Sequence, residues 1–152
     1  MKVLQTLMIA AAVFSGTPAM AHDDATLDKM AAPHGGQLRM AGVYHFELVV
    51  AKDSKEVKDN PVLVYLTDHA DKKVPSAGTR GTVTILAGKE KTTVQLLPDG
   101  DNKLKGSGRY ASDPAMKAIV SITFADGKTE QTRHEPLKNA PAPADPHAGH
   151  KH

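Results

Sequence analysis

The chain has 152 residues, which suits one domain, because single domains cluster near ~100–150 residues. Hydrophobic residues make up 40% and charged residues 24%, a globular balance that argues against a wholly disordered chain and a polytopic membrane protein. The absence of cysteine excludes disulfides and thiolate metal sites, and a formal net charge of +2 is too weak to indicate a nucleic-acid partner.

Residues 1–21 have the three-part pattern of a secretory signal peptide. Lys2 precedes an apolar run over residues 3–14, and Ala19-Met20-Ala21 provides a small-residue cleavage site. The apolar run is too short to span a bilayer as a permanent anchor, and a membrane-anchored N-terminus is the alternative. We therefore expect cleavage after Ala21, a periplasmic location, and no membrane contact after cleavage.

The mature part of the chain divides by composition into three segments. Residues 22–32 are polar and rich in small residues, and we interpret them as a flexible leader with at most one short helical turn. Residues 139–152 contain three prolines and little to bury, which predicts a disordered tail. The folded unit is then 33–138, about the size of a small β-sandwich domain.

Within the folded unit, apolar side chains recur with the period of two that is typical of β-strands. Gly106 and Gly108 lie within the predicted strand 104–110, where glycines indicate a β-bulge or an edge strand. Asp126-Gly127 is the strongest hairpin signal in the chain. The pattern predicts about seven short strands, over residues 43–50, 62–67, 82–87, 92–97, 104–110, 118–125 and 128–134.

This spacing of strands and turns predicts an all-β domain. Our first expectation is an immunoglobulin-like β-sandwich of about seven strands. A small open barrel is the alternative, because periodicity does not distinguish a closed sheet from two packed sheets.

His45 and Glu47 are the first candidate metal ligands. They are two residues apart in a predicted strand, so their side chains leave the same face, roughly 7 Å apart at the backbone. Imidazole nitrogen and carboxylate oxygen both suit Zn²⁺ and Cu²⁺. The alternative is a solvated strand face with a weak cross-strand pair.

Two further histidines lie in predicted turns. His34 precedes Gly35-Gly36, whose free choice of backbone conformation allows a sharp turn that aims the imidazole toward the sheet. His69 follows the strand 62–67, at a loop position of the kind that often carries binding function. For both residues the alternative is an exposed turn histidine.

The chain ends carry the remaining candidate ligands. His147, His150 and His152 place three imidazoles in six residues, which indicates either a flexible metal-binding tract or a solvated tail. Cleavage after Ala21 makes His22 the N-terminus, whose amine and imidazole would form a chelating pair for copper. This resembles copper-carrying periplasmic sandwiches and copper monooxygenases whose mature chains begin with histidine.

The sequence offers little for catalysis. Ser107 lies between two glycines, but the nucleophile-elbow pattern G-x-S-x-G is absent. No nucleophile, base and orienting group stand together in a recognisable order. We therefore do not expect an enzyme.

The order of segments in residues 33–128 is similar to that of a known group of proteins. The segments are PHGGQL, GVYHFELVV, VYLTDHADKKVPSAG, GTVTILAGKEKTTVQLLPDGDNKLKGSG and AIVSITFADGK. They resemble small periplasmic proteins, and N-terminal domains of periplasmic adaptor subunits, that accompany bacterial heavy-metal efflux systems. The resemblance implies a metal-linked periplasmic β domain, with His34 and the His45/Glu47 strand in its most recognisable segments. The long helical hairpin and lipoyl-like parts of an adaptor are missing here.

We therefore expect a periplasmic accessory protein that buffers or delivers copper or zinc, with a periplasmic efflux component as its partner. Its folded site would use His34, His45, Glu47 and His69, and the C-terminal histidines would act as a flexible collector. The alternative is a non-catalytic envelope interaction module that binds a protein partner without metal, by strand addition at the edge strand 128–134.

Overall fold

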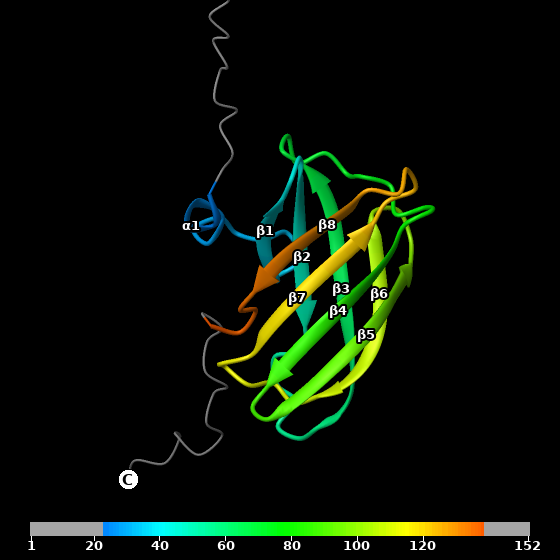
Figure 1. Ribbon diagram of the computed structural model, residues 1–152. Helices are drawn as coiled ribbons and strands as arrows, with labels where there is room; N and C mark the ends of the chain where they lie inside the picture. Colours follow the sequence, from blue (N-terminus) through cyan, green and yellow to red (C-terminus); the bar gives the residue numbers. More distant parts are fainter. Residues whose placement is uncertain (1–22, 139–152) are drawn as a thin grey trace, which may run out of the picture.

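Eight antiparallel strands and one helical turn make up the structure, a computed structural model that describes residues 23–138 (Figure 1). No helix within these residues is both long and apolar enough to cross a membrane. The elements are α1 (Asp24–Leu27), β1 (Gln37–Ala41), β2 (Tyr44–Val50), β3 (Lys58–Asp68), β4 (Arg80–Ala87), β5 (Glu90–Pro98), β6 (Lys103–Tyr110), β7 (Lys117–Thr123) and β8 (Thr129–His134).

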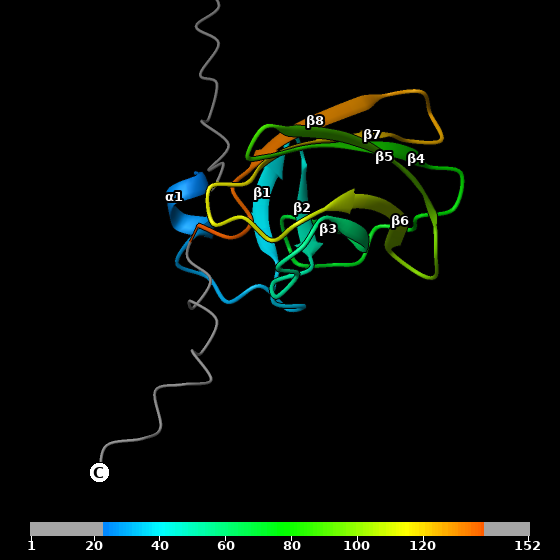
Figure 2. The ribbon, with the colours of Figure 1, turned by 90° about the horizontal axis from the view of Figure 1, so that it is seen from below.

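The strands form a single sheet in the order β1-β2-β3-β6-β5-β4-β7-β8. The sheet bends round until its two end strands, β1 and β8, come into contact. Seen from below, β4, β5, β7 and β8 lie on one side, and β1, β2, β3 and β6 lie on the other (Figure 2). The prediction of an all-β domain is confirmed, in the form of one nearly closed antiparallel sheet.

The pattern predicted about seven strands, and the described residues form eight, because Gln37–Ala41 is also a strand, β1. Arg39 of this strand is buried and stands opposite Phe46 of β2. The strand was not predicted because its inward position carries a charged residue, whereas strands are recognised by apolar residues at such positions. Gly42, with φ of 60°, makes the tight turn from β1 into β2. The predicted hairpin around Asp126-Gly127 is confirmed as β7 and β8.

The core lies inside the bent sheet and is mainly aliphatic, with fully buried side chains such as Val64, Leu66 and Val83. The glycines of β6 mark a close strand crossing, and β6 is not an edge, because it lies between β3 and β5. A Cβ atom added at Gly106 would lie 2.3 Å from the carbonyl oxygen of Gln95. Glycine is therefore needed where β5 crosses β6.

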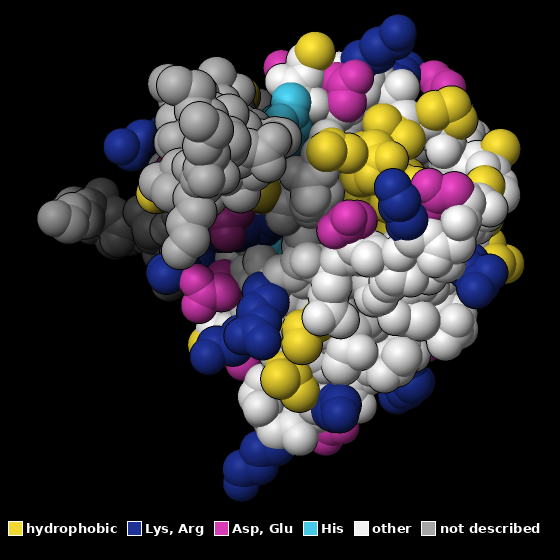
Figure 3. Space-filling model, turned by 45° about the horizontal axis from the view of Figure 1, so that its top comes forward, with side chains coloured by type: hydrophobic (Ala, Val, Ile, Leu, Met, Phe, Trp, Pro, Cys, Tyr) yellow, Lys and Arg dark blue, Asp and Glu magenta, His cyan; other side chains and the backbone are white. Residues whose placement is uncertain are grey.

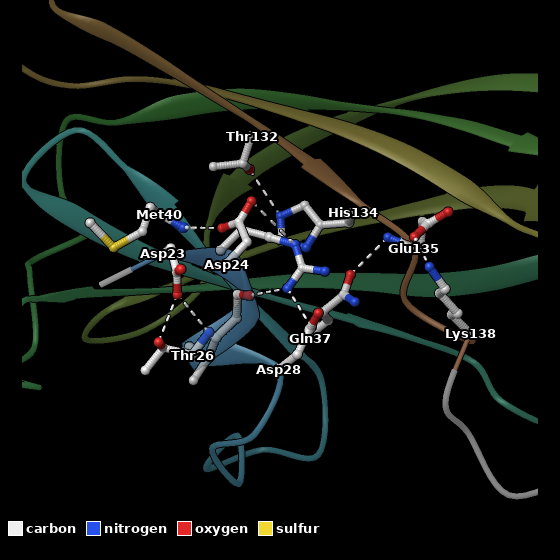
Figure 4. A network of polar contacts seen from close by, with 12 residues as sticks. Asp23, Asp24, Thr26, Asp28, Gln37, Met40, Thr132, His134, Glu135 and Lys138 are labelled. Carbon is white, nitrogen blue, oxygen red and sulfur yellow. Dashed lines mark hydrogen bonds and ion pairs between the residues drawn. The ribbon is translucent and has the colours of Figure 1, made fainter. Parts of the chain in front are cut away.

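Side chains bridge the seam between β1 and β8 (Figure 4). Gln37 Oε1 accepts a hydrogen bond from the backbone N–H of Glu135 at 2.7 Å. Arg39 Nη1 donates to Asp28 Oδ1 at 2.7 Å, and the guanidinium also lies 3.8 Å from Asp24 Oδ2. Leu27 of α1 is buried, so the helical turn expected in the leader packs against the sheet.

His134 lies at this seam and is only 2% exposed. Its Nε2 shares a hydrogen bond of 2.9 Å with Thr132 Oγ1. Burial, and secondly the positive charge of Arg39, lower the pKa of His134 to about 3. The imidazole is therefore neutral in the folded protein at any pH near neutrality.

The low pKa of His134 predicts a loss of stability in acid. In the unfolded chain, His134 binds a proton below the ordinary histidine pKa of about 6.5. In the folded chain, the same residue is protonated only near pH 3, so acid favours the unfolded chain. The free energy of unfolding, measured with urea, should therefore fall between these pH values by at most about 1.4 kcal/mol per pH unit. His134→Gln should show a shallower fall, and His69→Gln, at an exposed position, should keep the original slope. An unchanged slope in His134→Gln would contradict this account.

Candidate functional site

His45 and Glu47 project from β2 on the face opposite the core, because Phe46 and Leu48 occupy the inward positions. They do share one face, as the strand pattern predicted. However, His45 is 2% and Glu47 is 3% exposed, so a solvated strand face is excluded. Loops cover this outer face of the sheet, and each residue meets a different one.

The loop before β1 covers Glu47. Glu47 Oε1 accepts hydrogen bonds from the backbone N–H groups of His34 at 2.8 Å and Gly36 at 3.0 Å. Its second oxygen, Oε2, lies 2.8 Å from His34 Nδ1. The loop can approach so closely because residue 36 is glycine: a Cβ atom there would lie 2.4 Å from the carbonyl oxygen of Leu48. The turn directs His34 to the sheet, as the glycine pair predicted.

The imidazole of His34 is fixed on two sides. Its ring stacks on Tyr65 of β3, with 3.5 Å between the ring centroids and 2° between the planes. Tyr65 stands directly opposite Glu47 in the register of β2 and β3. An ionised carboxylate can only accept hydrogen bonds, so beside an ionised Glu47 a neutral His34 imidazole would carry its proton on Nδ1 and a lone pair on Nε2. The His34 side chain is 40% exposed, so its imidazole is accessible from solvent.

The turn after β3 covers His45. The backbone of this turn folds back on β3 through a bridge between Thr67 and Lys73. The rings of His45 and His69 stack with 5.0 Å between centroids, and His45 Nδ1 lies 3.8 Å from Asp71 Oδ1. Asp71 adopts φ of 58°, a conformation that aspartate tolerates better than most residues.

The structure thus sorts the four folded candidates into two pairs, His34 with Glu47 and His45 with His69. Within residues 23–138, no three His, Asp or Glu side chains gather closely enough to hold a metal ion. The remaining candidates lie outside the described residues: His22, His147, His150 and His152.

Tyr65 and Asp71 contact the candidate histidines, although neither was predicted as a site residue. Side chains alternate between the two faces of a strand, and Tyr65 lies between the buried residues Val64 and Leu66. The sequence of the strand therefore indicates that Tyr65 faces outward. That Tyr65 stands opposite Glu47 follows from the strand register, which no local pattern specifies.

Hydrophobic side chains gather at the top of the molecule, between charged side chains of both signs (Figure 3). This end includes the turn between β1 and β2, where Val43 is 65% exposed. This end of the molecule therefore presents an apolar surface, and the charges around it are of both signs.

The chain matches no family model, no curated protein and no solved structure.

The His34–Glu47 geometry predicts the tautomer of His34. In Glu47→Gln the amide oxygen can still accept from the two backbone N–H groups, but the NH₂ group then faces His34 Nδ1 and moves the imidazole proton to Nε2. Long-range ¹H–¹⁵N NMR of the neutral imidazole should show the Nδ1–H form in the native protein and the Nε2–H form in the variant. The signals of His69 serve as an internal control. A native His34 protonated on Nε2 would contradict the assignment.

Proposed function

We propose that the protein is a periplasmic metal-binding accessory protein that buffers or delivers Cu²⁺ or Zn²⁺ in connection with heavy-metal efflux or resistance. The observation that supports this function best is the half-exposed imidazole of His34, held through Nδ1 by the buried carboxylate of Glu47. In this proposal His34 is the metal ligand and Glu47 orients it.

A histidine that binds a metal usually donates its other ring N–H to a carboxylate, a carbonyl or water. Such a partner fixes the tautomer and the ring orientation, and it makes the ligand nitrogen more basic. Here Glu47 provides the carboxylate, and stacking on Tyr65 restrains the ring further. The three hydrogen bonds that Glu47 already accepts favour this orienting role over direct coordination.

The choice of ion and compartment rests on the sequence. Imidazole ligands without thiolates suit Cu²⁺ and Zn²⁺, and the chain has no cysteine. The signal-like residues 1–21 and the resemblance of residues 33–128 to proteins of heavy-metal efflux systems support a periplasmic accessory role. We propose no catalytic role.

The alternative function, a protein-binding module that adds a strand at β8, meets an obstacle in the fold. The free edge of β8 lies beside β1, and Gln37 bridges across to Glu135. An incoming strand would first have to open this seam. The finer expectation of an immunoglobulin-like sandwich stays a prediction, since a nearly closed sheet is also compatible with the small open barrel.

Calorimetric titration of the mature chain with Cu²⁺ and with Zn²⁺ tests the proposed function. At least one ion should bind with Kd below ~10 μM, about −7 kcal/mol. His34→Ala should weaken binding by at least the 10–100-fold that loss of an orienting partner typically causes. The matched control is His69→Ala, an exposed turn histidine without a carboxylate on its ring, which should change Kd by less than about threefold.

Weaker binding of both ions to the native chain would contradict the proposed function. Unchanged affinity in His34→Ala would contradict the assignment of His34 as the ligand.

A further inference from the structure

A surface hollow of about 560 Å³ lies against three neighbouring strands, β4, β7 and β8 (Figure 1). Sites for small molecules are typically clefts of ~300–1,000 Å³, so this hollow has the size of a ligand site. None of the candidate metal ligands among the described residues lines it. Five of its lining side chains share the outer face of the three strands: Thr84, Leu86, Lys117, Ile119 and Arg133.

Part of this β4–β7–β8 hollow is apolar. Leu86 is 44% exposed, which is unusual for a leucine inside a strand. Thr84 stands directly opposite Ile119 in the register of β4 and β7, and Leu86 is a diagonal neighbour of Ile119 on the same face. Diagonal neighbours are within reach of each other's side chains, so the leucine and the isoleucine form one apolar surface. A ligand with an apolar body would remove this surface from water.

Two cations stand beside this apolar surface. Lys117 lies directly opposite Leu86, and Arg133 lies directly opposite Ile119. The two cations are diagonal neighbours, roughly 7–8 Å apart at the backbone, so both long side chains can reach one anionic group. No ion pair within residues 23–138 involves Lys117 or Arg133.

The hollow also reaches the seam between β1 and β8, where two carboxylates line it. Asp24 Oδ2 lies 3.8 Å from Arg39 Nε, and Glu135 Oε2 lies 3.0 Å from Lys138 Nζ. Lys138 lowers the pKa of Glu135 most, and Lys117 contributes less, so the charge of this carboxylate is balanced mainly by Lys138. These carboxylates would repel an extended anionic surface such as a bilayer, whereas a small anion can bind at the cations alone.

We propose that the β4–β7–β8 hollow binds a small amphipathic acid, an organic anion with one carboxylate and an apolar body such as a short acyl chain. The carboxylate pairs with Lys117 and Arg133, and the apolar body covers Leu86 and Ile119. The arginine can donate two parallel hydrogen bonds to a carboxylate, which adds directionality to the charge attraction. This site is separate from His34 and does not depend on the proposed metal-binding function.

Titration of the full mature chain with decanoate, below its micelle-forming concentration and with a metal chelator present, tests the proposal. Two-dimensional ¹H–¹⁵N NMR locates the amide groups that respond and gives Kd. Decanol, which has the same apolar body without the charge, is the matched probe. The variants are Lys117→Gln, Arg133→Gln and their combination. Arg80→Gln and Lys105→Gln are the controls, because both remove exposed cations that do not line the hollow.

We expect decanoate to shift amide signals of β4, β7 and β8 in one saturable step, and decanol to bind more weakly. Lys117→Gln and Arg133→Gln should each weaken decanoate binding roughly two- to fivefold, the range that exposed ion pairs give. The double variant should no longer prefer decanoate to decanol. Leu86→Thr should weaken the binding of both probes, because it removes apolar surface and leaves the charges in place. Both control variants should keep the native Kd.

Shifts centred on another surface, such as the turn that carries the exposed Val43, would overturn the proposal. Equal affinity for decanoate and decanol would do so too, as would a double variant that keeps the native preference. Absence of binding, or binding only to decanoate micelles or to vesicles of anionic lipid, would also contradict it. None of these outcomes affects the proposed metal-binding function.

Discussion

A carboxylate that is withdrawn from water must find hydrogen-bond donors, and Glu47 finds all three of its donors in the loop before β1. Alternation along β2 puts Glu47 on the outer face, because Phe46 and Leu48 fill the core. Two backbone N–H groups then hold the loop against the sheet, and Gly36 permits the close approach. The orientation of His34 thus follows from the need to satisfy a buried polar group.

Buried polar groups must also find partners at the seam between β1 and β8, where the sheet nearly closes. Arg39 faces inward and is paired with Asp24 of α1 and with Asp28 just after it, while His134 stays neutral in the same buried surroundings. Gln37 ties β1 to the chain just after β8. Closure of the sheet therefore brings Glu135, just after β8, beside Gln37, which follows the loop that carries His34.

The alternating pattern predicted most strands, the β7–β8 hairpin and the common face of His45 and Glu47, because alternation reports the side of a strand on which a residue lies. It does not report what covers that side. Loops from distant parts of the chain bury both residues, and the strand register sets Tyr65 opposite Glu47. Strand β1 was not predicted for a related reason, since its inward-facing Arg39 carries a charge that is paired with Asp28, just after α1.

We propose that His34 binds a metal ion through Nε2 while Glu47 holds Nδ1. An anomalous difference map from crystals of the mature chain grown with Zn²⁺ tests it most directly. The account predicts a single strong peak about 2.0–2.1 Å from His34 Nε2, with the 2.8 Å contact between His34 Nδ1 and Glu47 Oε2 preserved. A peak between His45 and His69, or a zinc ion bound directly by Glu47, would contradict it.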